Sequence, residues 1–276
     1  MKLFKKVVIV GTGLIGGSIG LAIKKKKLAD TVIGISRRRS TIDLARKIKA
    51  IDSGFQDLSA ARGADLLILA VPVNTLVKLS PRLSKVTERE CIVTDVGSTK
   101  ERIVAKLDRL FPNFVGAHPL AGLEKSGVAN ACRCIFENAL CIITPTKSTN
   151  KRSLRKVAAL WKALGSRIVF MPAKKHDRIA AIVSHLPHVA AFSLANSVPA
   201  NYLKFAAGGF KSTTRIAASD PQAWAQIFIA NKKNILNSLC IFEKNIDGIK
   251  SAIKKEDHAA LSRILKRSQQ IREKLA

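Results

Sequence analysis

A glycine-rich turn between an apolar run and a helical pattern constrains this chain of 276 residues more than any other stretch. Four apolar residues, Val7 to Val10, lead directly into Gly11-x-Gly13-x-x-Gly16, and apolar residues then recur at helical spacing. A strand, a tight glycine turn and a helix N-terminus suit a dinucleotide pyrophosphate, because backbone N–H groups and the helix dipole meet the phosphates there. We expect the cofactor-binding residues of this turn to be Gly11, Gly13, Leu14, Ile15 and Gly16.

The three lysines before the apolar run are also typical of a secretory signal peptide. However, five glycines interrupt the run, no small-residue cleavage site follows it, and Lys24 to Lys27 end it with a second basic block. The cysteines are odd in number, and Cys132-x-Cys134 lacks the spacing of a zinc or redox pair. We therefore expect a cytoplasmic protein with reduced thiols and no metal.

The chain is strongly basic, with 48 Lys and Arg against 19 Asp and Glu and a net charge of +29. The basic residues are spread through every segment, and no aromatic residues interleave them as a stacking platform for nucleic acid requires. We interpret the charge as a solvated surface and expect no specific nucleic-acid partner; a basic nucleic-acid-binding protein is the alternative from a different class. Apart from the glycine-rich helix, no stretch reaches the apolar length of a membrane span.

The second predicted strand, residues 31–36, bears on the choice of cofactor. An Asp or Glu usually ends this strand in an NAD-binding fold and accepts from the ribose 2′-hydroxyl. Here Ser36 is followed by three arginines. A hydroxyl and guanidinium groups bind a 2′-phosphate, whereas a carboxylate repels it. We therefore predict NADP, held by Ser36, Arg37 and Arg38, with NAD as the alternative.

Further strands are predicted at residues 64–72, 91–96, 138–145 and 167–171, with helical patterns between them. This order predicts an α/β fold with a doubly wound Rossmann sheet over residues 1–171. Ligands bind at the carboxyl ends of such strands. That rule places Val71 and Pro72 at the cofactor and Ser98 at the mouth of the site.

Residues 114–127 form a predicted glycine-rich loop that carries His118 and Glu124 and follows a short strand. A histidine beside a proline in such a loop is seldom a packed core residue, so His118 is a candidate functional group. A structural role for His118 remains the alternative at this point.

The sequence is helical from residue 172 onward, which predicts an all-α domain over residues 172–276. A helix over 176–197, kinked by Pro187, carries His185 and His188 on one face, but no third metal ligand lies nearby in sequence. Lys211 and Arg215, in a loop entering a helix, can hold carboxylates. Apolar helices over 222–245 and 257–274 favour a homodimer through this domain.

Five motifs together carry a resemblance to one family. They are Gly11-Thr-Gly-Leu-Ile-Gly-Gly-Ser18, Thr94-Asp-Val-Gly-Ser98-Thr-Lys100, Gly116-Ala-His118-Pro-Leu-Ala-Gly122, Ser184-His185-Leu-Pro-His188 and Gly209-Phe-Lys211-Ser-Thr-Thr-Arg215. Their order resembles that of prephenate and arogenate dehydrogenases, and the resemblance covers nearly the whole chain. It implies a Rossmann sheet followed by an all-α domain, as in 6-phosphogluconate dehydrogenase-like proteins. From this resemblance we expect neither a fused chorismate mutase nor a C-terminal regulatory domain.

The resemblance implies oxidative decarboxylation of prephenate to 4-hydroxyphenylpyruvate and CO2 in tyrosine biosynthesis, with hydride transfer to NADP or NAD. Oxidation of arogenate to tyrosine is the alternative, and a β-hydroxyacid dehydrogenase is a more distant one. Ser212 stands where some relatives carry an acid. An acid there or nearby could bind the arogenate amino group, so its absence leans toward prephenate, although Glu124 could do the same job.

The same resemblance assigns roles to single residues. His118 would be the base that takes the hydroxyl proton. Ser98 would bond the same hydroxyl or orient His118. The substrate-binding residues would be Arg215 as a carboxylate clamp, Lys211 and His188 at the side-chain end, Glu124 at the mouth and, with a packing role as the alternative, His185.

Overall fold

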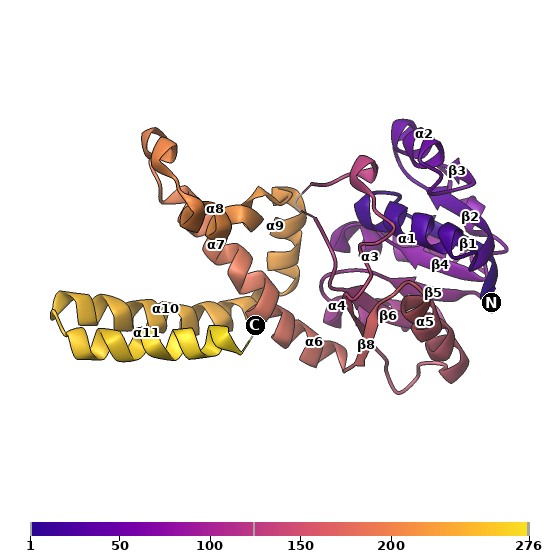
Figure 1. Ribbon diagram of the computed structural model, residues 1–276. Coiled ribbons are helices and arrows are strands. Elements are labelled where there is room, and N and C mark those ends of the chain that lie inside the picture. Colours follow the sequence, from indigo (N-terminus) through magenta and orange to yellow (C-terminus); the bar gives the residue numbers. More distant parts are fainter. Residues whose placement is uncertain (1, 124, 275–276) are drawn as a thin grey trace. The chain divides into compact units, whose positions relative to one another are not determined.

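The computed structural model describes residues 2–123 and 125–274 (Figure 1). The chain divides into two compact units, of which the first ends at Asn231 and the second begins at Lys232. The domain boundary predicted at Met171-Pro172 lies within the first unit and stays a prediction.

An eight-stranded sheet forms the centre of the first unit, in the order β3-β2-β1-β4-β5-β6-β7-β8. The strands from β3 to β6 pair in parallel, β7 pairs antiparallel with β6, and β8 pairs parallel with β7. The strands are β1 (Phe4–Val10), β2 (Ala29–Ile35), β3 (Ser53–Phe55), β4 (Leu66–Leu69), β5 (Ile92–Asp95), β6 (Phe114–Pro119), β7 (Leu140–Thr144) and β8 (Arg167–Phe170). The sheet confirms the predicted doubly wound α/β class.

Helices cover both faces of this sheet and continue into the rest of the first unit (Figure 1). The helices that belong to the sheet region are α1 (Leu14–Lys25), α2 (Arg39–Lys47), η1 (Leu58–Ala61), α3 (Val73–Leu83), α4 (Glu101–Leu107), η2 (Val128–Asn130) and α5 (Lys151–Ala163). Those that follow β8 are α6 (Ala173–Ala180), η3 (Ala181–His185), α7 (Leu186–Asn196), η4 (Ala200–Phe205), α8 (Gly208–Thr214), η5 (Arg215–Ala218) and α9 (Pro221–Ala230).

The two faces of the sheet pack against different helices, because successive side chains of a strand point to opposite faces. On one face Ile9 and Ile68 pack in a cluster with residues of α1, α2 and α5, including Trp161. On the other, Val8 and Leu67 pack with residues of α3 and α4. All four residues of β4 are buried, which explains its unbroken aliphatic run.

The structure corrects the predicted loop around His118. Residues Phe114 to Pro119 form strand β6, and His118 lies opposite Ile142 of the antiparallel neighbour β7. Gly116 is needed within this strand, since a Cβ there would lie 2.5 Å from the Thr144 hydroxyl. Gly116 therefore reflects close packing in the sheet, and the strand that contains it carries His118, whereas Gly122 and Gly127 lie after the strand.

The helices after β8 also differ from the predicted pattern. The kink expected at Pro187 is replaced by the π-helical turn η3, which ends two residues before that proline. The helix expected over 222–245 is interrupted at Asn231, whose side chain donates to the backbone oxygen of Asp177 at 2.7 Å. The stretch expected as a loop before Arg215 is the short helix α8.

The expectation that no stretch beyond the glycine-rich helix reaches the length of a membrane span was wrong: Ala173–Asn196 is long and apolar enough by length and composition alone, with a mean hydropathy of 1.3. Only 22% of that window is buried. Nevertheless His176, Asp177 and His185 of this stretch are buried and polar, so it contributes to the folded interior of the first unit.

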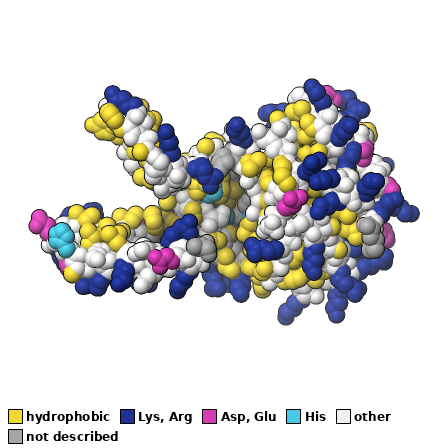
Figure 2. All heavy atoms as spheres, in the orientation of Figure 1, with side chains coloured by type: hydrophobic (Ala, Val, Ile, Leu, Met, Phe, Trp, Pro, Cys, Tyr) yellow, Lys and Arg dark blue, Asp and Glu magenta, His cyan; other side chains and the backbone are white. Residues whose placement is uncertain are grey.

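The second unit is a hairpin of two helices, α10 (Lys232–Lys254) and α11 (His258–Glu273) (Figure 1). Both helices carry exposed apolar side chains, and yellow side chains follow the hairpin in Figure 2. The exposed apolar residues of the hairpin are Leu236, Ile241, Ile246, Ile253, Leu265 and Ile271.

The basic side chains are scattered over the visible face of the sheet-containing region rather than gathered in one patch (Figure 2). This distribution agrees with the interpretation of the charge as a solvated surface.

Candidate active site

The turn between β1 and α1 has the backbone geometry that a pyrophosphate requires. Gly11 has a φ of +95°, which residues other than glycine rarely adopt. A Cβ on Gly16 would lie 1.9 Å from the Gly11 oxygen. Gly13 caps α1 without a side-chain hydrogen bond, and a Cβ there would meet nothing within 4 Å. The N–H groups of the first turn of α1 therefore suit a phosphate.

A cavity of about 750 Å³ opens at this turn, at the carboxyl ends of β1, β2 and β4. Most of the predicted cofactor-binding residues line it, namely Gly11, Gly13, Ser36, Arg37, Arg38, Val71 and Pro72. Leu14, Ile15 and Gly16 form the first turn of α1 and are not among its lining residues. The cavity and the turn together fit a dinucleotide.

The end of β2 is held against the glycine turn by hydrogen bonds. The Thr12 backbone N–H donates to Ser36 Oγ at 3.1 Å, and the two hydroxyl oxygens lie 2.7 Å apart. Arg37 and Arg38 are exposed beside them. Sequence reasoning missed three other charged residues of the cavity wall, Asp57, Arg82 and Asp220. Hydrogen bonds from Ser59, with a smaller contribution from Arg82, lower the pKa of the Asp57 carboxyl.

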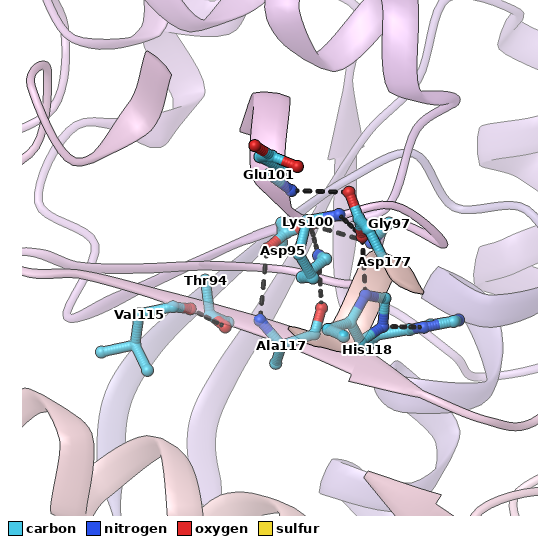
Figure 3. Close-up of polar contacts among 10 residues, drawn as sticks. Thr94, Asp95, Gly97, Lys100, Glu101, Val115, Ala117, His118 and Asp177 are labelled. Carbon is cyan, nitrogen blue, oxygen red and sulfur yellow. Dashed lines mark hydrogen bonds and ion pairs between the residues drawn. The ribbon is translucent and has the colours of Figure 1, made fainter. Parts of the chain in front are cut away.

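His118 is the first member of a buried chain of hydrogen bonds. Its Nδ1 lies 2.8 Å from His176 Nε2, and His176 Nδ1 lies 2.7 Å from Asp177 Oδ1 (Figure 3). A carboxylate only accepts, so His176 donates from Nδ1 and, when neutral, accepts at Nε2. His118 therefore donates from Nδ1, and its Nε2 carries the lone pair. The chain of contacts leaves His118 in the tautomer that a base requires.

Asp177 also fixes the start of α4. Its carboxylate accepts from the Lys100 N–H at 2.6 Å and from the Glu101 N–H at 2.9 Å. These are the unpaired donors of a helix N-terminus, where a negative charge is favourable. Asp177 thus joins α6 to α4 and orients His176 at the same time.

A second buried network holds the strand that carries His118. The Lys100 ammonium group forms an ion pair with Asp95 and donates to the Ala117 oxygen at 2.7 Å (Figure 3). Asp95 accepts from the N–H groups of Gly97 at 2.9 Å and Ala117 at 3.2 Å. Ala117 immediately precedes His118, so these contacts fix the backbone of the candidate base.

The surroundings keep His118 neutral. Burial, followed by the nearby His176 and Lys100, lowers the pKa of His118 well below its usual value. Imidazole in this environment is unprotonated at neutral pH and can accept a proton at Nε2.

Two further histidines lie on the helical stretch that follows. His185 is buried and its Nδ1 accepts from the Asn231 side chain at 3.1 Å; its Nε2 has no hydrogen-bond partner among the described residues. Burial lowers the pKa of His185 to about 4. His188 stacks on Trp224 with ring centroids 3.4 Å apart and donates from Nδ1 to the Ser184 oxygen at 3.0 Å. Burial also lowers the pKa of His188.

The remaining predicted site residues are less enclosed. Ser98 is half-buried in the turn between β5 and α4, Lys211 is exposed on α8, and Arg215 is exposed at the start of η5. Glu124 lies outside the described residues. Within residues 2–123 and 125–274, no group of three His, Cys, Asp or Glu side chains is placed to hold a metal ion.

Sequence reasoning missed four residues of the network around His118. These residues are Asp95, Lys100, His176 and Asp177. The signal in the sequence was Asp95 at the end of a strand that is predicted to be buried. A buried carboxylate without a partner is energetically costly, so its presence indicates a buried partner. Nothing in the local pattern indicates that His176 reaches β6.

Comparisons with known proteins cover almost the whole chain. Residues 19–170 match the family model described as the nucleotide-binding domain of prephenate dehydrogenase, and residues 172–267 match its dimerization domain. A prephenate dehydrogenase of Bacillus subtilis is 38% identical over 98% of this chain and 76% of its own length. A cyclohexadienyl dehydrogenase of Zymomonas mobilis is 32% identical over 99% of this chain and 96% of its own.

Solved structures give the same result. The prephenate dehydrogenase of Aquifex aeolicus, in complex with hydroxyphenyl propionate and NAD+, has a TM-score of 0.93 at 33% identity and covers 99% of this chain and 98% of its own. An arogenate dehydrogenase of Synechocystis has a TM-score of 0.82 at 28% identity and covers 98% of this chain and 100% of its own.

Proposed function

Because the chain belongs to the prephenate dehydrogenase family, we propose that it converts prephenate to 4-hydroxyphenylpyruvate and CO2 in tyrosine biosynthesis. It is an oxidoreductase that uses a nicotinamide dinucleotide. The observation that carries the proposal for its site is the lone pair on His118 Nε2, presented by a buried and neutral imidazole.

In the proposed reaction, His118 accepts the proton of the substrate ring hydroxyl at Nε2. The positive charge that forms on His118 is stabilised through His176 by the Asp177 carboxylate, as in other sites where a third group orients the catalytic base. The bound nicotinamide supplies the hydride acceptor, and loss of the ring carboxylate as CO2 makes the product aromatic. Lys100 and Asp95 hold the strand so that no reorganisation is needed at the reacting hydroxyl.

Lys211 and Arg215 are proposed to bind the substrate carboxylates. They lie four residues apart on consecutive helical segments, and a guanidinium group can bind a carboxylate in a bidentate manner. His185 is proposed to donate from its unpartnered Nε2, and His188, stacked on Trp224, to line the same pocket. Ser98 would form a hydrogen bond with the ring hydroxyl, and Glu124 would lie at the mouth of the substrate pocket.

We propose NADP as the preferred dinucleotide. The support is the absence of a carboxylate at the end of β2, where Ser36 precedes Arg37 and Arg38 on the cavity wall. Asp57 on the same wall is the group that would favour NAD, because an ionised carboxylate repels a 2′-phosphate. Changing Arg37 to Ala should therefore lower the NADP preference several-fold.

The deciding experiment measures the appearance of reduced cofactor with each pairing of prephenate or arogenate with NADP or NAD. Turnover of prephenate with NADP at the highest kcat/KM is expected. Faster turnover of arogenate would reassign the substrate, and a preference for NAD would refute the argument from the arginines. Arogenate is the second candidate, because Glu124 could bind its amino group where Ser212 replaces the acid of some relatives.

A homodimer in the cytoplasm is also proposed. The family model names the matching region a dimerization domain, and α10 and α11 each expose a series of apolar side chains. Size-exclusion chromatography with light scattering should give twice the chain mass, and a stable monomer would contradict the proposal. No membrane and no specific nucleic acid enter it.

A further inference from the structure

The turn that follows η2 carries two cysteines that the proposed function does not use. Cys132 is half-buried and Cys134 is exposed. The Cys134 backbone N–H donates to Cys132 Sγ at 3.4 Å. Although Cys-x-Cys is not the usual spacing of a redox pair, the folded turn holds the Cys132 sulfur against the backbone N–H of Cys134.

The same contacts make the two thiols chemically different. Hydrogen bonds from the Cys134 thiol and from its backbone N–H lower the pKa of the Cys132 thiol, and Arg133 contributes in the same direction. Burial raises the pKa of Cys91 to about 12 and raises that of Cys141. Since the thiolate is the nucleophile, Cys132 is the reactive thiol of this turn.

We propose that Cys132 and Cys134 form a site of reversible oxidation by hydrogen peroxide and related hydroperoxides, with an intrachain disulfide as the oxidised form. The pair combines an accessible attacking thiol with a neighbouring resolving thiol, which is the arrangement of redox-sensing cysteines. Such disulfides form transiently in reducing compartments.

Both steps balance without a further reactant. The Cys132 thiolate attacks one peroxide oxygen, the O–O bond breaks, and Cys132 becomes a sulfenic acid while the other oxygen leaves as water after taking a proton. The Cys134 sulfur then attacks the sulfenic sulfur, the S–S bond forms, and the sulfenic oxygen leaves as a second water. Two thiols lose two electrons and two protons, and one hydrogen peroxide is reduced.

The site is connected to the helix that begins at the dinucleotide turn. The Cys132 N–H donates to Ser18 Oγ at 2.9 Å, and Ser18 donates to the Leu14 oxygen at 2.7 Å, both within α1. The side chain of Ala131 fills the space beside Gly17. A disulfide would replace the N–H···S contact by a sulfur–sulfur bond of about 2.05 Å, and we expect the closed ring to shift the Cys132 backbone and weaken its hydrogen bond to Ser18.

The chemistry is tested on the full chain with hydrogen peroxide, followed by alkylation of the denatured protein and peptide mass spectrometry. Cys132 and Cys134 should become resistant to alkylation together, with the loss of two hydrogen masses, and dithiothreitol should restore both. Cys240 is the internal reference, because it is an exposed thiol on α10 without a cysteine neighbour. Oxidation of Cys132 no faster than Cys240 would overturn the proposal.

Two variants separate the two steps. Cys134→Ser should stop at a Cys132 sulfenic acid that dimedone traps, whereas Cys132→Ser should leave Cys134 no more reactive than Cys240. The Cys240→Ser control should form the disulfide as the wild type does. A wild-type protein that accumulates the sulfenic acid without a disulfide would refute the pairing.

The link through Ser18 is tested by binding rather than by turnover. Fluorescence titration should show that the oxidised chain binds reduced dinucleotide about threefold or more weakly than the reduced chain, as the weakening of one hydrogen bond implies. The peroxide-treated Cys132→Ser/Cys134→Ser variant should keep the affinity of its untreated form. Equal affinities for the oxidised and reduced wild type would refute the link.

Discussion

The region around His118 and the region around Arg215 both bear candidate site residues, yet the first is enclosed and the second is open. His118, His176 and Asp177 are buried and joined by hydrogen bonds of 2.8 and 2.7 Å. Helix α8 and the turn η5 contain no buried residue. The comparison indicates that buried hydrogen bonds hold the proposed proton acceptor in place, whereas the proposed carboxylate-binding side chains lie on exposed helical segments.

The largest effect should follow from removing the base. His118→Asn is expected to lower kcat by about 10²–10⁴, because general-base catalysis contributes on that scale. Dinucleotide affinity, measured by fluorescence titration, should not change and serves as the control for folding. Wild-type turnover in this variant would place the proton acceptor outside the enclosed region.

The enclosed region should also make stability depend on pH. The folded pKa of His185, about 4, lies below its ordinary value near 6.5. As the pH falls, the unfolded chain therefore binds the proton before the folded chain does. The stabilisation of the folded state by neutral His185 is present above about pH 6.5 and is lost progressively between pH 6.5 and pH 4. Over this range of pH, protonation of His185 should lower the free energy of unfolding by roughly 3 kcal/mol.

Denaturant titrations between pH 7 and pH 4 measure this loss. His185→Gln should flatten the pH dependence, whereas the matched change His258→Gln, at an exposed histidine of α11, should leave it as in the wild type. An identical slope in wild type and His185→Gln would show that His185 is not enclosed as described.

A smaller effect is expected from the residue that acts through His176. Asp177→Asn should lower kcat by about 10–100-fold with little change in KM, since it weakens the orientation of the base but leaves His118 in place. Its pH profile should also change, because the charge formed on His118 loses its counter-charge. A profile identical to that of the wild type would limit Asp177 to capping α4.

The smallest effect should come from the open region. Arg215→Ala is expected to raise KM for prephenate about tenfold with a small change in kcat, as the loss of a charge-assisted contact implies. Arg215→Lys should restore little of it, because the ammonium group lacks the planar fork. A variant that lowers kcat as strongly as Asp177→Asn would remove the contrast between the two regions.

Much of the fold was predictable because its signals are local. The glycine turn, the aliphatic strands and the order of strands and helices follow from backbone sterics and side-chain period, and the structure confirms them. The strand β6 was not predictable in this way, because Gly116 and the glycines that follow the strand are also typical of a loop. Its pairing with β7 is decided by residues more than twenty positions away.

By itself, the sequence predicted a dinucleotide-binding turn at Gly11 to Gly16, and it singled out His118 as the candidate base. Only the tertiary structure decided what surrounds that histidine. His176 meets His118 across 58 positions of the chain, and Asp177 meets Lys100 across 77. The physical reason is that a helix or strand pattern records only which face of an element is apolar, whereas a buried hydrogen bond requires two elements to be packed together.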